Sequence, residues 1–169
     1  MVSLLLFEEN WRPSKEGPHQ STFDADALRM AKTVKGDFSR EHGEPLRSSI
    51  PNNGAKEVVW HRVTDAGMRS RSGYWAPVGY QYHRAARADL DRDGKIDLVE
   101  MVESSDSRAL KITYGGKRPT RFVGRHKGKW VDQALVAAGP NAVLINNPES
   151  NLYFVYQRGS EMRAKFIGD

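Results

Sequence analysis

The stretch ADLDRDGKIDLVEMV, residues 88–102, carries the side chains of this sequence that are best suited to chemistry. Its aspartates are Asp89, Asp91, Asp93 and Asp97. Carboxylates this close in sequence repel one another unless a cation lies between them. The aspartates match positions 1, 3, 5 and 9 of a twelve-residue calcium loop, with Gly94 at position 6 and Glu100 at position 12.

Calcium is the cation that this pattern predicts. It takes about six to eight oxygen ligands at about 2.3–2.6 Å, and alternate residues of a tightly curled loop can point them inward. Gly94 permits the sharp turn because it has no Cβ, and Lys95 would contribute its carbonyl oxygen. The alternative is an acidic surface turn that binds no ion. The candidate ligands are Asp89, Asp91, Asp93, Lys95, Asp97 and Glu100.

The residues on either side of the loop separate two families of calcium loop. In an EF-hand, helices flank the loop and Glu100 would be a bidentate ligand. Before the loop, however, YHRAARA lacks the large apolar residues of an entry helix. Leu90 suits a strand that ends in the loop, and the apolar residues after the loop favour a second strand. The stretch ARADLDRDGKIDLVEMVES, followed by ALKITYGGK, covers about residues 86–117 and resembles a single FG-GAP/VCBS-type repeat, as found in integrin-like propellers.

That resemblance implies a structural ion. The ligands would be Asp89, Asp91, Asp93, the Lys95 carbonyl and Asp97, whereas Glu100 would be an ordinary strand residue. The calcium would tie a turn between two strands and would not activate water. Propellers carry several such repeats and this chain carries one, so a complete propeller is not expected.

The elements that must position the loop are predicted from periodicity and turn residues. Residues 1–20 are expected to form a flexible arm, because WRPSKEGPHQ contains two prolines and a glycine. Residues 21–169 are expected to form a single domain. Its helix covers about 23–36, where apolar residues recur at helical spacing. From about 56–169, short β-branched and aromatic runs alternate with turn residues, which is typical of an antiparallel meander. The predicted fold class is α+β: mainly short antiparallel β-strands with one N-terminal helix.

Three further stretches have less distinct patterns. WVDQALVAAGP is compatible with a short helix or a strand, and GYWAPVGYQYH with an edge strand or a loop, because proline interrupts it. REHGEPLRSSIPNNG has the composition of a loop.

Two segments could contact a partner. The basic segment, residues 115–130, contains no acid, and basic side chains pair with phosphates while exposed aromatics stack on bases or sugars. The alternative is a basic edge hairpin that resists edge-to-edge aggregation. The second segment is the aromatic one that contains Tyr74, Trp75, Tyr80 and Tyr82. It is equally compatible with an interface or a β core. The candidate partner-binding residues are Lys117, Arg118, Arg121, Arg125, Lys127, Lys129 and Trp130 in the first segment, and Tyr74, Trp75, Tyr80 and Tyr82 in the second.

Composition excludes several classes of site. The chain has 169 residues and no cysteine, so disulfides, thiolate zinc sites and cysteine nucleophiles are excluded. The histidines lack HxH or HExxH spacing, and the sequence has no GxSxG elbow, Walker loop or dinucleotide fingerprint. No apolar run approaches the roughly 20 residues of a membrane span, and no signal peptide is visible. The net charge of +5 favours polyanionic or acidic partners, or serves solubility alone.

These features favour a calcium-stabilised, non-enzymatic binding protein, for example an inhibitor or immunity-type factor with a protein partner. An anionic glycan or a nucleic acid is the other class of partner. A periplasmic or secreted location is favoured because millimolar calcium fills a loop of modest affinity, and a cytoplasmic location stays open. The alternative functions are a metal-dependent hydrolase for a phosphate- or glycan-containing substrate and a polyanion- or nucleic-acid-binding module.

Overall fold

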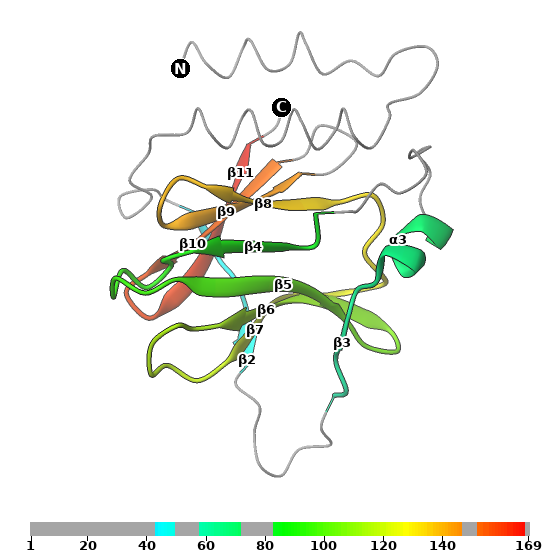
Figure 1. The fold of residues 1–169 in the computed structure, drawn as a ribbon, viewed down its shortest axis with the longest axis horizontal. Helices are drawn as coiled ribbons and strands as arrows, with labels where there is room; N and C mark the ends of the chain where they lie inside the picture. Colours follow the sequence, from blue (N-terminus) through cyan, green and yellow to red (C-terminus); the bar gives the residue numbers. More distant parts are fainter. Residues whose placement is uncertain (1–42, 50–57, 72–82, 147–151, 168–169) are drawn as a thin grey trace, which may run out of the picture.

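The computed structural model describes residues 43–49, 58–71, 83–146 and 152–167. This part of the chain is β-rich, with two antiparallel sheets and one short helix (Figure 1). The elements are β1 (Glu44–Pro45), β2 (Ser48–Ser49), β3 (His61–Arg62), α3 (Asp65–Arg71), β4 (Ala85–Ala88), β5 (Asp97–Glu103), β6 (Ser107–Thr113), β7 (Arg121–Lys127), β8 (Ala134–Ala138), β9 (Ala142–Asn146), β10 (Leu152–Arg158) and β11 (Glu161–Ile167). The prediction of short antiparallel strands is confirmed, whereas the predicted arm (1–20) and helix (23–36) lie outside the described residues.

Each sheet is built around a meander. Sheet A has the order β1-β11-β10-β9-β8, and sheet B has the order β2-β7-β6-β5, with β3 and β4 sharing the far edge of β5. The β10–β11 hairpin shows how turn residues set the register. Arg158 pairs with Glu161 across a two-residue loop whose first residue, Gly159, has φ 60°. A glycine at positive φ in this place is typical of a type II′ turn, whose twist matches that of the strands.

The two sheets are joined along both sides. On one side residues 43–49 run from β1 in sheet A to β2 in sheet B, and the Leu46 N–H donates to the Met162 carbonyl at 2.8 Å. On the other side β4 lies beside β8, and the Leu135 N–H donates to the His83 carbonyl at 3.0 Å. These connections cover strand edges that would otherwise offer unpaired backbone groups to other chains.

The core lies between the sheets. Successive side chains of a strand point to opposite faces, so Val99 and Met101 of β5 point inward together. Their register partners on β6, Ile112 and Leu110, point the same way. The core cluster joins these side chains to sheet A residues Leu135, Val143 and Val155. Sheet A is also apolar on its other face, where Leu144, Phe154 and Tyr156 are buried.

Several local predictions were incomplete for a common reason, which is element length. WVDQALVAAGP contains strand β8, and the predicted loop REHGEPLRSSIPNNG contains β1 and β2. A strand of two residues leaves no periodicity in the sequence, so its pairing partner decides that it forms. The short helix α3 was not predicted, because Met68 is its one buried apolar residue. The Thr64 hydroxyl caps it by accepting the Gly67 N–H at 3.0 Å. Among the described helices none is long and apolar enough to cross a membrane.

Candidate metal centre

The acidic loop, residues 89–96, connects β4 to β5 at one end of the two-sheet body. The turn between β6 and β7 lies at the same end, as the ribbon shows (Figure 1). Strands flank the loop on both sides, as expected for an FG-GAP/VCBS-type loop and unlike an EF-hand. Leu90 is buried in the core cluster, so its predicted inward packing is confirmed. This apolar contact anchors the beginning of the loop between the sheets.

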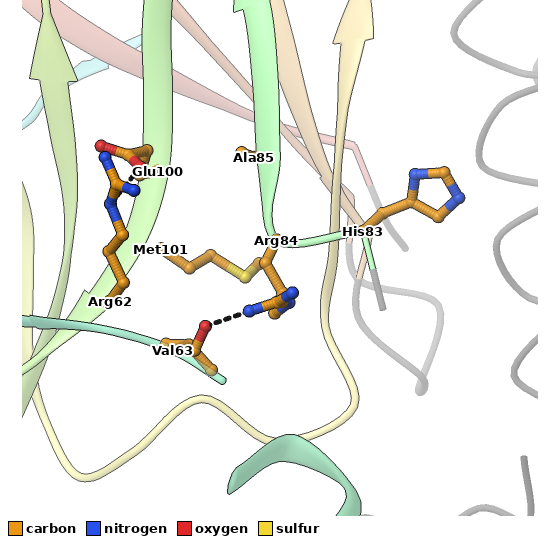
Figure 2. A pocket seen from close by; sticks show the side chains of 7 residues that line it. All are labelled: Arg62, Val63, His83, Arg84, Ala85, Glu100 and Met101. Atoms are coloured by element: carbon orange, nitrogen blue, oxygen red, sulfur yellow. Dashed lines mark hydrogen bonds and ion pairs between the residues drawn. The ribbon is translucent and has the colours of Figure 1, made fainter. Parts of the chain in front are cut away.

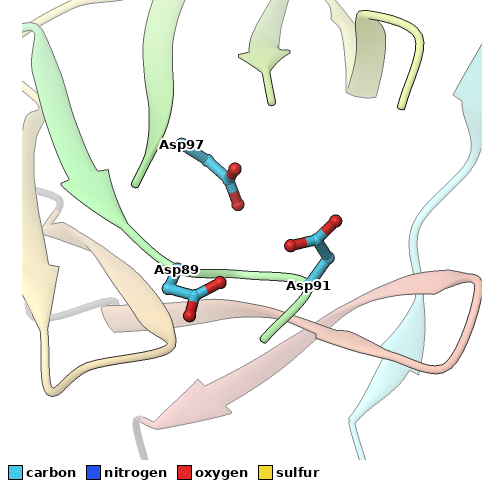
Figure 3. Close-up of side chains that lie close together, drawn as sticks. All are labelled: Asp89, Asp91 and Asp97. Carbon is cyan, nitrogen blue, oxygen red and sulfur yellow. The ribbon is translucent and has the colours of Figure 1, made fainter. Parts of the chain in front are cut away.

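Three carboxylates converge at the centre of the loop. Asp89, Asp91 and Asp97 each offer an oxygen, and these three atoms lie within 4.8 Å of one another (Figure 3). Asp97 is fully buried, and its two oxygens accept the Leu90 N–H at 2.8 Å and the Gly115 N–H at 3.0 Å. Burial raises the pKa of Asp97, and the nearby charge of Asp91 raises it further, whereas these backbone hydrogen bonds lower it. A cation bound among the three carboxylates would therefore reduce the repulsion between them.

The loop backbone is shaped by its own aspartates. The Asp89 carboxylate accepts the Gly94 N–H at 2.9 Å and the Asp93 N–H at 3.1 Å. The Asp93 carboxylate in turn accepts the Lys95 N–H at 2.8 Å. Gly94 has φ +83°, which an L side chain rarely adopts, so the predicted need for glycine at this turn is confirmed. The loop is thus held in a curled conformation by bonds that do not require an ion.

The same loop connects the two sheets. The Asp89 N–H donates to the Pro140 carbonyl at 3.0 Å, and the Asn141 side chain donates to the Asp89 carbonyl at 2.7 Å. Both partners belong to the turn between β8 and β9 in sheet A. On the other side, Asp97 accepts from Gly115 in the β6–β7 turn of sheet B. An ion held by Asp89 and Asp97 would therefore cross-link the ends of both sheets.

Two glycines allow the β6–β7 turn to pack against the acidic loop. A Cβ at Gly115 would clash with the Ile96 carbonyl, and a Cβ at Gly116 would clash with the Asp93 carboxylate. The sequence indicates a turn at this Gly-Gly pair. It does not indicate the contact with the acidic loop, because the two segments are about twenty residues apart in sequence.

Arg118 also belongs to the acidic loop. Its Nε lies 2.7 Å from the Asp91 Oδ2, and the Asp91 side chain is 2% exposed. Sequence reasoning placed Arg118 on a partner-binding surface, and the structure instead places it against a candidate metal ligand. Because a guanidinium and a cation would both be attracted to the Asp91 carboxylate, Arg118 is a competitor for any ion at this site.

Glu100 does not join the cluster. It lies three residues after Asp97 on β5, so the two side chains point to opposite faces of the sheet. The Glu100 Oε1 pairs with the Arg62 Nε at 2.7 Å. Position 12 of an EF-hand loop therefore has no counterpart here, which agrees with the alternative interpretation of Glu100 as a strand residue. Asp93 lies outside the converging triad, and Lys95 is exposed.

The basic segment is divided between the two ends of β7 and is largely occupied by contacts within the chain. Four of its six cations contact acidic or carbonyl groups of the described residues. These contacts are Arg118 with Asp91, Arg121 with the Ser160 carbonyl at 2.7 Å, Arg125 with Asp106 at 3.7 Å, and Lys129 with Glu103 at 4.0 Å and the Ser104 carbonyl. Lys117 and Lys127 are exposed. The segment therefore does not present all of its charges on one face.

Trp130 is a core residue, so its predicted role in partner binding is wrong. Its side chain is 6% exposed, and its indole N–H donates to the Val102 carbonyl at 3.1 Å. The ring fills the end of the core where the chain crosses from β7 in sheet B to β8 in sheet A. An interleaved aromatic in a basic run is compatible with either position, and only the crossing decides between them. The aromatic candidates Tyr74, Trp75, Tyr80 and Tyr82 lie outside the described residues.

No family model matches the chain, and neither the curated proteins nor the solved structures that were compared with it include a match. The resemblance of residues 86–117 to an FG-GAP/VCBS-type repeat therefore stays a prediction. The function has to be argued from the geometry of the acidic loop and its surroundings.

Proposed function

We propose that this protein is a calcium-stabilised, non-enzymatic binding protein. The observation that carries the proposal is the convergence of Asp89, Asp91 and Asp97 at a loop that is hydrogen-bonded to both sheets. Oxygen ligands from carboxylates are those that calcium prefers. A cation at this point offsets the repulsion among the carboxylates and links the ends of the two sheets.

The hydrogen bonding of the loop supports a structural role for the ion. Both oxygens of Asp97 accept backbone N–H groups, and the Asp89 carboxylate accepts two more from the loop itself. Carboxylates held in this way are oriented toward a fixed point. A catalytic ion instead needs an open coordination position and a neighbouring acid or base in reach of a substrate.

The binding partner that the charge distribution favours is an acidic protein. Lys117 and Lys127 are exposed, and the net charge of the chain is +5. Exposed cations steer encounters with acidic surfaces. A periplasmic or extracellular setting, where calcium is millimolar, suits a structural site of modest affinity.

Thermal and chemical unfolding with and without calcium tests the ion. An ion that binds the native state alone stabilises it by about 2.7 kcal/mol at a concentration one hundred times its Kd. The Asp91→Asn variant is expected to lose most of this stabilisation. Asp106→Asn makes the same chemical change in the β5–β6 turn at the other end of sheet B, and its response to calcium should equal that of the wild type. An unchanged melting temperature between chelator and millimolar calcium would contradict the proposal.

Charge reversal tests the partner. Wild-type protein and a Lys117→Glu/Lys127→Glu variant are compared as baits in calcium, after melting curves have shown that both are folded. A specific partner should be recovered by the wild type and lost from the variant. Equal recovery on both baits, or no stable partner for the wild type, would count against an acidic protein as the partner.

A further inference from the structure

A cavity of about 360 Å³ opens between β3 and β4, where both strands meet the edge of β5 (Figure 2). At Met101 this edge changes partner, because the Met101 N–H donates to the Arg84 carbonyl at 2.9 Å and the Met101 carbonyl accepts the Val63 N–H at 3.2 Å. Beyond these bonds the two strands separate, because β3 leads into α3 and the chain at β4 turns toward β8. Small-molecule sites commonly have volumes of about 300–1,000 Å³, so this cavity is large enough for a small ligand.

Glu100 lines this cavity and carries an acceptor without a partner among the described residues. Its residue is 6% exposed, and its Oε1 is bonded to Arg62. Its Oε2 is buried and has no hydrogen-bond partner within the described part of the chain. Buried polar groups in native proteins nearly always have a partner, and one without a partner calls for a ligand or a water as donor. A ligand that occupies the cavity is thus expected to carry a hydrogen-bond donor at this point.

The surroundings of Glu100 are basic. Arg62 lines the cavity, its Nε holds the Glu100 Oε1 at 2.7 Å, and its side chain is 71% exposed, so its guanidinium is accessible to a ligand. Arg84 lines the cavity and pairs with Asp65 at 3.0 Å, and Lys111 lies opposite Glu100 in the register of β5 and β6. Three cations therefore surround two carboxylates. This excess of positive charge favours a ligand that also carries an anionic group.

The remaining wall is apolar. Val63, Ala85 and Met101 line the cavity beside the charged pair. His83 also lines the cavity, but its imidazole points away from the other lining side chains (Figure 2). A ligand side chain that enters this part of the cavity should be small and uncharged.

We propose that this cavity binds a small zwitterion of the amino-acid class with an apolar side chain. The ammonium group donates to the Glu100 Oε2, and the carboxylate accepts from the terminal nitrogens of Arg62. These two protein groups form one ion pair, so their ligand-binding atoms are close enough to engage the two charges that an α-amino acid carries on one carbon. Glu100 points to the opposite face of β5 from Asp97, so this ion pair is separate from the acidic loop.

Calorimetric titration of the full chain tests this inference, with L-alanine, L-valine, L-leucine and L-methionine as probes. At least one should bind. Two analogues of L-valine separate the two charges: isobutylamine lacks the carboxylate, and isovalerate lacks the ammonium. Each should bind at least about tenfold more weakly than L-valine, because a charge-assisted hydrogen bond contributes about 1.5–3 kcal/mol.

Two substitutions locate the binding. Glu100→Gln and Arg62→Gln should each weaken the best amino acid at least about tenfold. Arg87→Gln, which changes an exposed arginine on the neighbouring strand β4, should bind it as the wild type does. If Glu100→Gln does not fold, Arg62→Gln still tests the site, because Arg62 is largely exposed. Absence of heat for all four amino acids would overturn the inference, as would equal binding of either analogue or equal binding by both variants. The calcium melting curves are unaffected by any of these results, so the two proposals can fail separately.

Discussion

The acidic loop and the basic segment are both rich in charged residues, but they fold to opposite effect. In the loop, three carboxylates from residues 89–97 converge within 4.8 Å. In the basic segment, the cations are distributed along β7 and the turns at its two ends. The loop curls because Gly94 and the aspartate side chains close hydrogen bonds over two to five residues. A strand rises about 3.3 Å per residue, so residues eight apart are separated by roughly 25 Å.

The comparison shows that charge density in a sequence produces a site only where the backbone turns back on itself. An extended strand with the same density delivers its charges to several different neighbours, and there they act as structural contacts. Substitutions in the acidic loop should therefore lower the free energy of unfolding strongly, and their effects should depend on one another. Substitutions in the basic segment should lower it little, and their effects should be independent. The predictions below test this difference, beginning with the largest expected effect.

Asp97→Ala should produce the largest loss of stability. It removes the acceptor of two backbone N–H groups, those of Leu90 and Gly115, and each unpaired buried group costs about 1–3 kcal/mol. We expect the free energy of unfolding in urea to fall by about 3 kcal/mol, measured in chelator so that no ion contributes. Asp93→Ala changes an exposed aspartate of the same loop and should cost less than about 1 kcal/mol. Equal losses in the two variants would show that burial does not distinguish these aspartates.

Gly115→Ala should cost about 2 kcal/mol, within the range for overpacking a filled site. Its Cβ would meet the backbone carbonyl of Ile96, which cannot move without shifting the acidic loop. Gly116→Ala should cost less, because its Cβ meets the end of the Asp93 side chain, which can rotate. Chemical unfolding of the two variants side by side measures the difference. A larger loss of stability in Gly116→Ala than in Gly115→Ala would mean that the backbone of the acidic loop shifts more easily than the Asp93 side chain rotates.

Arg118→Gln tests the ion pair between the basic segment and the acidic loop. In chelator the loss should be below about 1 kcal/mol, because Arg118 is partly exposed. Calcium affinity should rise, by up to about fivefold, because the ion no longer competes with the guanidinium for Asp91. Arg125→Gln removes a cation at the other end of β7 and should leave calcium affinity unchanged. An affinity that stays constant or falls in Arg118→Gln would contradict the competition.

Asp106→Asn should have the smallest effect. The Ser107 hydroxyl, and then Ser104 and Arg125, hold the pKa of Asp106 below its ordinary value of 3.8. A carboxyl with a lower pKa in the folded state stabilises the protein above its unfolded pKa, and this stabilisation is lost as the pH falls through the folded value. The variant should therefore melt slightly below the wild type at neutral pH, and the difference should disappear in acid. Melting curves across this pH range measure it, and a difference that grows in acid would be inconsistent with the assigned contacts.

Local patterns were sufficient for much of the fold. The alternation and turn residues predicted the strands that became β5, β6, β7, β9, β10 and β11. The spacing of the aspartates predicted the curled loop, and Leu90 predicted its anchor. Each of these features depends on residues within about ten positions, where backbone geometry and side-chain period act directly. The two-residue strands β1 and β2 and the seven-residue α3 were missed, because elements so short are stabilised by their partners and not by their own sequence.

The charged residues show where prediction from sequence ends. The Asp-rich spacing and Gly94 by themselves determined that a tight acidic turn forms, because hydrogen bonds over two to five residues close it. Only the tertiary structure decided that Arg118 faces Asp91, that Trp130 enters the core, and that Glu100 turns away from the loop toward Arg62. The reason is that these contacts join residues 27 to 38 positions apart or depend on where the chain crosses between sheets. Such distances in sequence are bridged by strand register and sheet order, which no local pattern contains.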